Sequence, residues 1–254
     1  MRILVIPDLH GKSRWKYAVE QLTFDKVVFV GDYTDCFYHT NNDIIENLRN
    51  VVEFAMQTKS ILLMGNHDLQ YAYSAGPSDV NYRCSGYRPE IAFMLRHIFE
   101  SNKSLFQVCY LEPNTKLLFS HAGISSKWWK SVSQQLIEQD WIADVDTIAD
   151  ILNKTNQTSN QYLLHVVGWS RGGSKPAGGL TWADKTETQS GIIKGYHQIV
   201  GHTPVPAIET CKKISGTLHT DRSITYTDCL DTVDQYLIIN VNDDGSHEFE
   251  IHNI

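Results

Sequence analysis

Five short apolar runs recur along the chain, and each one ends in a cluster of polar residues. The runs are rich in Val, Ile, Leu and Phe and lack polar alternation, which is typical of strands buried on both faces. We therefore expect five strands, one at the start of each of the segments 2–10, 26–35, 60–68, 116–123 and 197–204.

Two stretches of helical character separate the first three runs. They cover residues 13–22 and 42–58, and in the second stretch apolar residues recur every three or four positions. The order strand–helix–strand–helix–strand implies parallel pairing with right-handed crossovers. Ligands of such sheets gather beyond the carboxyl ends of the strands. The polar tips of all five runs are expected at those ends.

The rest of the chain is less regular. Residues 73–89 and 169–180 read as loops, and a helix is expected over 89–101. Residues 124–164 have helical character. Three segments of the tail read as closing strands, with a plausible hairpin turn between the last two. These segments are 223–230, 236–242 and 247–254.

Composition narrows the class of protein. A chain of 254 residues with 42% hydrophobic residues can bury a full core. Its net charge of −7 argues against a protein that coats nucleic acid, although bound cations can reverse the local field. The five cysteines are widely spaced without a CxxC motif, which fits reduced thiols in the cytoplasm. The chain has neither a signal peptide nor a run of about 18 apolar residues, so we expect a cytoplasmic protein without a membrane partner. The oligomeric state stays open.

The polar residues at the ends of the five runs are candidate metal ligands. Carboxylates, imidazoles and one amide follow the five runs, and these are ligands for hard or borderline divalent cations. Asp8 and His10 are two residues apart at a strand end, so both can reach one ion. Two cations about 3.5–4 Å apart that share a carboxylate are a common arrangement for phosphoryl hydrolysis. The candidate residues are Asp8, His10, Asp32, Asp35, Asn66, His67, His121 and His202.

The motifs DLHG, GDYTD, GNHD, SHAG and GHTP occur in the order typical of the calcineurin-like metallophosphoesterases, and the chain resembles that superfamily from residue 3 to about residue 204. The resemblance implies one domain over residues 1–254 with a helical insertion at about 124–164. It also implies an α/β fold, a four-layer α-β-β-α sandwich of two mixed sheets flanked by helices.

Within the superfamily, GDYTD, HAGIS and GLTWAD resemble the phosphoprotein-phosphatase branch, which includes serine/threonine phosphatases and diadenosine-tetraphosphatase-like enzymes. Pro204 replaces an extra histidine ligand that many phosphodiesterase members use. The resemblance implies a metallophosphatase that hydrolyses phosphomonoesters by attack of a metal-bridging hydroxide. Three alternatives stay open: a dinucleoside polyphosphate pyrophosphohydrolase, a phosphodiesterase, and a scaffold without activity.

The resemblance also assigns roles to the strand-end residues. It implies two divalent metal ions, and the donor set accepts Mn, Fe or Zn. Asp8 and His10 would hold the first ion, and Asp32 would bridge both. The second ion would be held by Asn66, His121 and His202.

A proton donor and its partner complete the implied site. His67 follows a predicted metal ligand and would protonate the leaving oxygen. Asp35 would orient His67 and keep it cationic, because a nearby carboxylate raises the pKa of an imidazole.

The phosphate-binding residues are where the chain departs from the pattern of the branch. The branch has an arginine directly after GDxVD, and here that position is Cys36, which cannot form a bidentate phosphate contact. Arg171, in WSRGG, resembles a second phosphate-binding arginine of the branch. Arg83 and Arg88 are further candidates, together with the amide of Asn66. The expected partner is a phosphorylated substrate, either a phosphoprotein or a nucleotide, with nucleic acid disfavoured.

Overall fold

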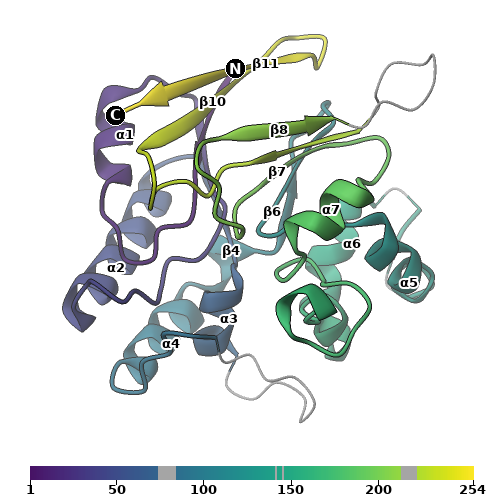
Figure 1. The fold of residues 1–254 in the computed structure, drawn as a ribbon, viewed down its shortest axis with the longest axis horizontal. Helices are drawn as coiled ribbons and strands as arrows, with labels where there is room; N and C mark the ends of the chain where they lie inside the picture. Colours follow the sequence, from purple (N-terminus) through teal and green to yellow (C-terminus); the bar gives the residue numbers. More distant parts are fainter. Residues whose placement is uncertain (74–83, 141, 145, 213–221) are drawn as a thin grey trace.

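Two mixed β-sheets lie face to face, and helices cover their outer faces (Figure 1). The computed structural model describes residues 1–73, 84–140, 142–144, 146–212 and 222–254. The two sheets and their flanking helices confirm the α/β sandwich that the resemblance implies. Helices α1 and α2 lie on one side of the sandwich, and α5, α6 and α7 lie on the other.

The first sheet has the strand order β11-β10-β1-β2-β3-β4. Strands β1 to β3 are parallel to one another, as the strand–helix–strand order predicts, and β4 pairs parallel with β3. The β10–β11 hairpin from the tail joins the sheet antiparallel to β1. The strands are β1 (Arg2–Ile6), β2 (Lys26–Phe29), β3 (Ser60–Leu63), β4 (Phe106–Gln107), β10 (Gln235–Val241) and β11 (His247–Asn253).

The second sheet has the order β5-β6-β7-β9-β8, and its three central strands are parallel. The edge strands β5 and β8 are antiparallel to their neighbours. The strands are β5 (Cys109–Leu111), β6 (Leu117–Ser120), β7 (His197–Val200), β8 (Glu209–Lys212) and β9 (Ser223–Tyr226).

Helices complete the two outer layers. Figure 1 shows α1 and α2 beside the first sheet, and α5 and α6 beside the second. Helices α5 and α6 lie within the segment 124–164; that this segment is an insertion stays a prediction. The helices are α1 (Trp15–Gln21), α2 (Asn41–Gln57), α3 (Asn66–Ala72), α4 (Ala92–Ser101), α5 (Ser126–Ile137), α6 (Ile148–Thr155) and α7 (Lys185–Ser190), with short 3₁₀ turns at Lys103–Leu105, Ser159–Leu163 and Trp169–Arg171.

Strand β1 shows why the apolar runs lack polar alternation. Ile3 and Val5 face the second sheet and belong to the core between the sheets. Leu4 and Ile6 point the other way and belong to the core under the helices. Because successive side chains of a strand point to opposite faces, a strand between two apolar layers needs apolar residues at every position.

All five predicted strands and the three tail strands are confirmed, and so are the helices expected over 13–22, 42–58 and 89–101. The sequence did not predict α3, α7 or the edge strands β4, β5 and β8. These elements have two to seven residues, which is too short to show a clear hydrophobic period. The predicted loop 73–89 lies mostly outside the described residues.

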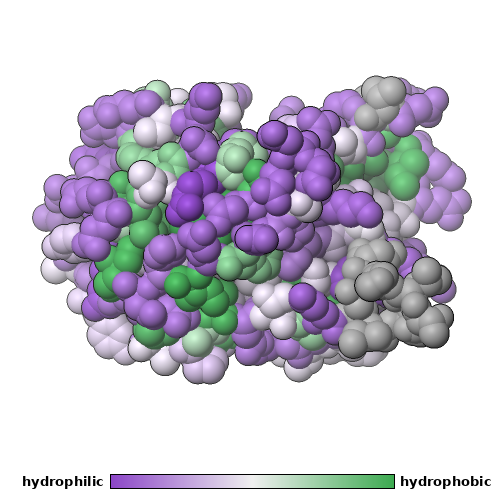
Figure 2. Space-filling view, turned by 90° about the horizontal axis from the view of Figure 1, so that it is seen from above, coloured by the Kyte–Doolittle hydropathy of each residue, from purple (hydrophilic) through white to green (hydrophobic). Residues whose placement is uncertain are grey.

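The described helices include none that is both long and apolar enough to cross a bilayer. Seen from above, where the β10–β11 hairpin lies, the surface is mostly hydrophilic and its apolar residues form small separate groups (Figure 2).

A buried histidine beside α6 gives the folded protein a specific sensitivity to acid. The ring of His165 faces the Thr181 hydroxyl at 3.1 Å and the Asn156 side-chain oxygen at 2.9 Å. Burial lowers the pKa of His165 to about 3, so below its ordinary pKa of 6.5 the unfolded chain binds a proton that the folded chain excludes. Stability therefore falls as the pH falls from 6.5 towards 3. Between pH 7 and pH 5 we expect this residue to remove about 2 kcal/mol from the free energy of unfolding.

Urea titrations at the two pH values measure this effect. His165→Gln has a neutral side chain that can both donate and accept a hydrogen bond. Between pH 7 and pH 5, the free energy of unfolding of this variant should therefore fall by about 2 kcal/mol less than that of the native chain. Equal losses in the two proteins would contradict the assignment.

Candidate metal centre

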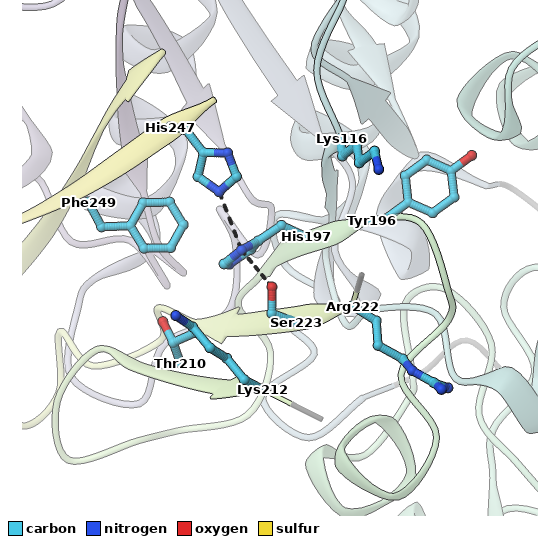
Figure 3. A pocket seen from close by; sticks show the side chains of 9 residues that line it. All are labelled: Lys116, Tyr196, His197, Thr210, Lys212, Arg222, Ser223, His247 and Phe249. Atoms are coloured by element: carbon cyan, nitrogen blue, oxygen red, sulfur yellow. Dashed lines mark hydrogen bonds between the residues drawn. The ribbon is translucent and has the colours of Figure 1, made fainter. Parts of the chain in front are cut away.

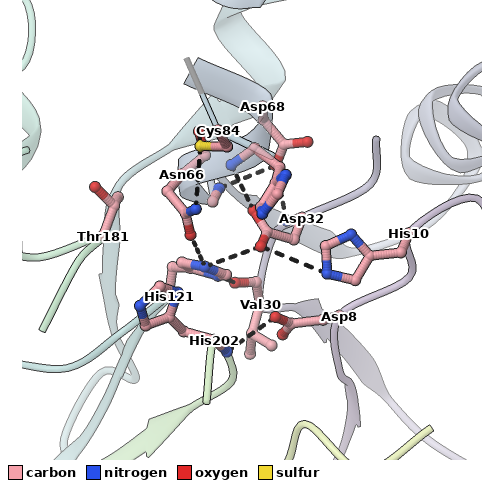
Figure 4. A network of polar contacts seen from close by, with 12 residues as sticks. Asp8, His10, Val30, Asp32, Asn66, Asp68, Cys84, His121, Thr181 and His202 are labelled. Atoms are coloured by element: carbon pink, nitrogen blue, oxygen red, sulfur yellow. Dashed lines mark hydrogen bonds and ion pairs between the residues drawn. The ribbon is translucent and has the colours of Figure 1, made fainter. Parts of the chain in front are cut away.

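The polar tips of the predicted strands meet at the carboxyl ends of β1, β2, β3, β6 and β7 (Figure 4). Two groups of side chains there are spaced for a cation, with one ligand atom per residue and all ligand atoms of a group within 4.8 Å of one another. One group is Asp8, His10 and Asp32. The other is Asp32, His121 and His202. Asp32 belongs to both groups, so the structure brings these five predicted residues together around one shared carboxylate.

Four of the predicted site residues have a left-handed backbone. The φ angles are 44° for His10, 53° for Asp32, 57° for Asp35 and 65° for His202. Among the described non-glycine residues, Asn114 alone joins them in this region. Such a conformation costs about 1–3 kcal/mol per residue and tends to occur at functional sites. The four side chains are therefore held in the site by a strained backbone.

Asp32 occupies the centre of the site. Its Oδ1 accepts a hydrogen bond from the backbone N–H of His67 at 2.9 Å. Its Oδ2 lies 3.4 Å from His121 Nε2 and 3.7 Å from His10 Nε2. One carboxylate oxygen thus fixes the start of α3, and the other faces an imidazole from each group.

The second ring nitrogen of His10 and of His121 shows which tautomer each imidazole adopts. His10 Nδ1 lies 3.0 Å from the Thr34 carbonyl and 2.9 Å from the Asp35 carbonyl. His121 Nδ1 lies 2.8 Å from the Val30 carbonyl. A carbonyl oxygen only accepts, so Nδ1 carries the proton in the neutral form of both rings, and Nε2 then presents a lone pair to the site. Backbone carbonyls commonly orient metal-binding histidines in this way.

Two buried polar atoms test whether a cation fits these residues. Asp8 Oδ2 accepts a hydrogen bond from the His202 backbone N–H at 2.9 Å. Within the described part of the chain, Asp8 Oδ1 and His202 Nε2 are both buried and have no hydrogen-bond partner. Burying a polar atom without a partner is costly. A divalent cation fits, because the unpartnered atoms are an oxygen and an imidazole nitrogen.

The electrostatics of the site point in the same direction. Burial and the nearby charge of Asp228 raise the pKa of Asp8 well above its usual value. Burial alone would lower the pKa of His121, but the charges of Asp32 and Asp8 outweigh it and raise that pKa to about 9. The carboxylates therefore favour positive charge in the site, which a proton on His121 provides here and which a bound cation would supply in its place.

Asn66 is oriented by a residue that the sequence did not single out. Its Nδ2 donates to Cys84 Sγ at 3.3 Å, and this leaves its Oδ1 facing His121 Nε2 at 3.0 Å. Opposite a neutral His121 with its proton on Nδ1, the amide oxygen would face acceptor against acceptor, so either a proton on Nε2 or a cation between the two atoms is needed. No motif marked Cys84 in advance.

His67 and Asp35 form the predicted pair. His67 Nδ1 lies 2.9 Å from Asp35 Oδ2, and the His67 ring stands at 89° to that of His10 with centroids 5.0 Å apart. Burial would lower the pKa of His67, but Asp32 and Asp35 raise it to about 9. Asp35 also accepts hydrogen bonds from Gln70 and Tyr71 of α3, two partners that no motif revealed.

Asp68, the last residue of GNHD, has a role that the sequence analysis missed. Its carboxylate accepts hydrogen bonds from the backbone N–H groups of Gly65 at 2.9 Å, Asp32 at 2.8 Å and Tyr33 at 2.9 Å. It thereby ties the loop after β2 to the N-terminus of α3. Its presence in the motif was the signal that could have identified it.

Arg88 and Cys36, which were discussed for phosphate binding, make other contacts in this structure. The guanidinium of Arg88 donates to Asn41 Oδ1 at 2.6 Å, to the His39 carbonyl at 2.9 Å and to the Cys36 carbonyl, so it holds the loop before α2. The side chain of Cys36 is buried in the core under the helices.

Of the arginine candidates among the described residues, Arg171 lies near the second group. Its Nη2 donates to Thr203 Oγ1 at 2.6 Å, one residue after His202, and its Nε lies 2.8 Å from Asp184 Oδ2. Its side chain is 25% exposed, and its charge contributes to the lowered pKa of His202 after burial and His121. Arg83 lies outside the described residues.

The backbone of Gly201 lies so close to the Asp8 carboxylate that a larger residue would not fit there. A Cβ atom there would collide with Asp8 Oδ1 and lie 2.9 Å from a Val30 methyl group. We expect Gly201→Ala to displace the Asp8 carboxylate and to weaken Mn²⁺ binding by about 10–100-fold, as measured by calorimetry. Gly195→Ala is the control, because its Cβ would meet no atom within 4 Å while its positive φ costs about 1 kcal/mol of stability. Unchanged Mn²⁺ affinity in Gly201→Ala would contradict a role for Asp8 as a ligand.

The sequence matches the model of the calcineurin-like phosphoesterase family over residues 1–206. A search of curated proteins finds no match. Among solved structures, the chain is similar to a metallophosphoesterase from Sphaerobacter thermophilus, with 15% identity, a TM-score of 0.49, and coverage of 100% of this chain and 88% of that chain. It is also similar to a hypothetical protein from Pyrococcus horikoshii OT3, with 8% identity, a TM-score of 0.44, and coverage of 100% and 87%.

Proposed function

The chain belongs to the calcineurin-like phosphoesterase family, and we propose that it is a dinuclear metal-dependent phosphatase of the phosphoprotein-phosphatase branch that hydrolyses phosphomonoesters. Membership of the family makes the chain a metal-dependent phosphoric ester hydrolase. One observation carries the finer proposal: two cation-spaced groups share Asp32, and the His67–Asp35 pair lies beside them.

Two divalent ions fit the ligand sets. Asp8 and His10 would hold the first ion together with Asp32, and the remaining ligands of the second are Asn66, His121 and His202. Carboxylate, imidazole and amide donors suit Mn, Fe or Zn, so the donor set alone leaves the metal open. Bound there, the ions supply Lewis acidity and lower the pKa of a water nucleophile.

The chain's own residues would handle the proton of the leaving group. His67 donates a hydrogen bond from Nδ1–H to Asp35. Its Nε2 is therefore the atom that can transfer a proton to the leaving oxygen. Asp35 is held in turn by Tyr71 and Gln70, which fixes the direction of the imidazole. The backbone N–H of His67 bonds to Asp32, so the proton donor and the shared ligand keep a fixed relation.

Arg171 is our candidate for binding the phosphoryl group in place of the arginine that Cys36 replaces. Arg171→Ala should lower kcat/KM by about 10- to 100-fold, the range for losing a charged hydrogen bond. Arg49→Ala, on the exposed face of α2, is the matched control. Steady-state kinetics with an aryl phosphate measure both variants, and equal kcat/KM values would remove Arg171 from the proposal.

A monoester is favoured over a diester because of position 204. Pro204 follows the GHT residues at an exposed position and offers no ring nitrogen to a metal, whereas many phosphodiesterase members have a histidine ligand there. The net charge of −7 also disfavours a nucleic-acid diester.

Substrate profiling tests the proposal. The Mn²⁺-loaded protein is assayed between pH 6 and pH 9 with 4-nitrophenyl phosphate, a phosphoserine peptide, diadenosine tetraphosphate and bis(4-nitrophenyl) phosphate. We expect metal-dependent turnover of the two monoesters and faster reaction of the peptide than of the dinucleotide. Preference for the dinucleotide or the diester would replace the proposed substrate class, and no turnover of any compound would refute the proposal.

A further inference from the structure

A second pocket lies at the opposite end of the second sheet from the metal centre (Figure 3). It has a volume of about 520 Å³, which lies within the range of small-molecule sites. Its wall includes His197 at the start of β7 and Ser223 at the start of β9. Strand β7 leads from His197 towards His202, and five residues at about 3.3 Å each separate the pocket from the metal centre by about 16 Å.

The register of the strands brings the pocket residues together. Leu117, His197, Ser223 and Lys212 are successive partners across β6, β7, β9 and β8. Lys116 precedes Leu117 and lines the same pocket, and the start of β11 covers it from the first sheet with His247 and Phe249. Residues from both sheets thus converge where the core between the sheets ends.

The pocket is cationic in an acidic protein. Its described wall contains Lys116, Lys212 and Arg222 and two histidines, but neither Asp nor Glu. Two acidic neighbours among the described residues alternate away from the pocket: Glu209 pairs with Lys185, and Glu248 is exposed between two pocket residues. Asp221, which precedes Arg222, lies outside the described residues. Within the described ranges, neither Lys116 nor Lys212 forms an ion pair.

The centre of the pocket is the imidazole of His197, which is hydrogen-bonded on both ring nitrogens. The His197 ring faces Ser223 Oγ at 2.7 Å on Nδ1 and Thr225 Oγ1 at 2.8 Å on Nε2. Phe249 packs edge-on against this ring with centroids 4.7 Å apart, and His247 Nε2 lies 3.4 Å from Nδ1. Burial, then His247 and Lys212, lowers the pKa of His197 to about 3, so this ring is neutral and the lysines and the arginine carry the positive charge.

We propose that this pocket binds a phosphate-bearing small molecule with at least two anionic groups, at a site separate from the metal centre. Lys116, Lys212 and Arg222 come from three strand ends around the central imidazole, so one compact anion would not match all three. Phosphate groups carry more charge per group than carboxylates and accept hydrogen bonds from ammonium and hydroxyl donors. The proposal uses no residue of the metal centre and is independent of the proposed function.

Calorimetry with α,β-methylene-ADP tests the proposal on the full chain, both loaded with Mn²⁺ and after treatment with a chelator. We expect one binding event that persists without metal. Lys116→Ala/Lys212→Ala should weaken that event by about tenfold or more, because two charged contacts are lost. Both lysines are exposed, so the melting temperature should stay close to that of the native chain. Lys59→Ala/Lys130→Ala removes the same charge from exposed positions elsewhere and should bind normally.

Three results would overturn the proposal. The first is loss of all binding on chelation, which would place the ligand at the metal centre. The second is equal affinity of the native chain and the pocket variant. The third is tighter binding of citrate or of a short oligonucleotide than of α,β-methylene-ADP, which would assign the pocket to another class of anion.

Discussion

Asp32→Asn is expected to lower phosphate-ester turnover by more than about 100-fold and to remove most of the bound metal. Mutating a residue that only orients a metal ligand lowers metal affinity or activity by about 10–100-fold. Asp32 is proposed to contact both ions directly, so its loss should have a larger effect. Its Oδ2 is the atom that faces both His10 and His121, and asparagine lacks the negative charge needed to serve two cations.

The substitution is conservative everywhere except at that atom. Asparagine retains an oxygen that can accept the hydrogen bond of the His67 N–H, and it tolerates the left-handed backbone at φ 53°. Metal content by mass spectrometry and kcat by steady-state kinetics should fall together. Asp25→Asn, at an exposed position, is the control. Retention of two metal ions by Asp32→Asn would show that the shared-carboxylate arrangement is wrong.

The strands of this fold could be predicted because both faces of each central strand are covered. Ile3 and Leu4 are buried against different layers, so the sequence has to be apolar at both positions. The same reasoning fails for β8, an edge strand whose residues Glu209 to Lys212 alternate between half-buried and exposed. Edge strands need less apolar sequence, and their pairing is set by a neighbour far along the chain.

The proximity of the candidate site residues could be predicted for a different reason. Parallel strands place their carboxyl ends at one edge, so Asp8 and Asp32, which follow neighbouring strands of the first sheet, had to lie near one another once the strand order was known. His121 follows a strand of the second sheet and joins them because the two sheets pack with these ends together. The left-handed backbone that aims His10 and His202 was not visible in the sequence, because no residue type announces a positive φ as glycine does.

Contacts that depend on long loops were beyond sequence reasoning. Arg88 follows the end of the GNHD motif by 20 residues, and its guanidinium supports the loop that contains Cys36 and His39. Cys84 orients Asn66 from 18 residues away, and nothing in its neighbours marks it. Such pairings are set by the path of the loop in space, and hydrophobic periodicity carries no information about that path.

His67→Asn should have the opposite profile to Asp32→Asn: it should retain metal and lose rate. The backbone N–H of residue 67 still bonds to Asp32 Oδ1, and none of the proposed metal ligands changes. Loss of a general acid lowers kcat by about 10²–10⁴-fold. His97→Asn, at an exposed position on α4, serves as the control for replacing a histidine.

The leaving group distinguishes proton transfer from a structural role for His67. The oxygen of 4-nitrophenolate is a weak base that departs without a proton, whereas the phenolate oxygen of phenyl phosphate gains much from protonation. A general acid at position 67 therefore predicts a much smaller rate loss in His67→Asn with 4-nitrophenyl phosphate than with phenyl phosphate. If His67 only shaped the site, both substrates would slow by the same factor, and the roles assigned to His67 and Asp35 would have to be withdrawn even though metal binding was intact.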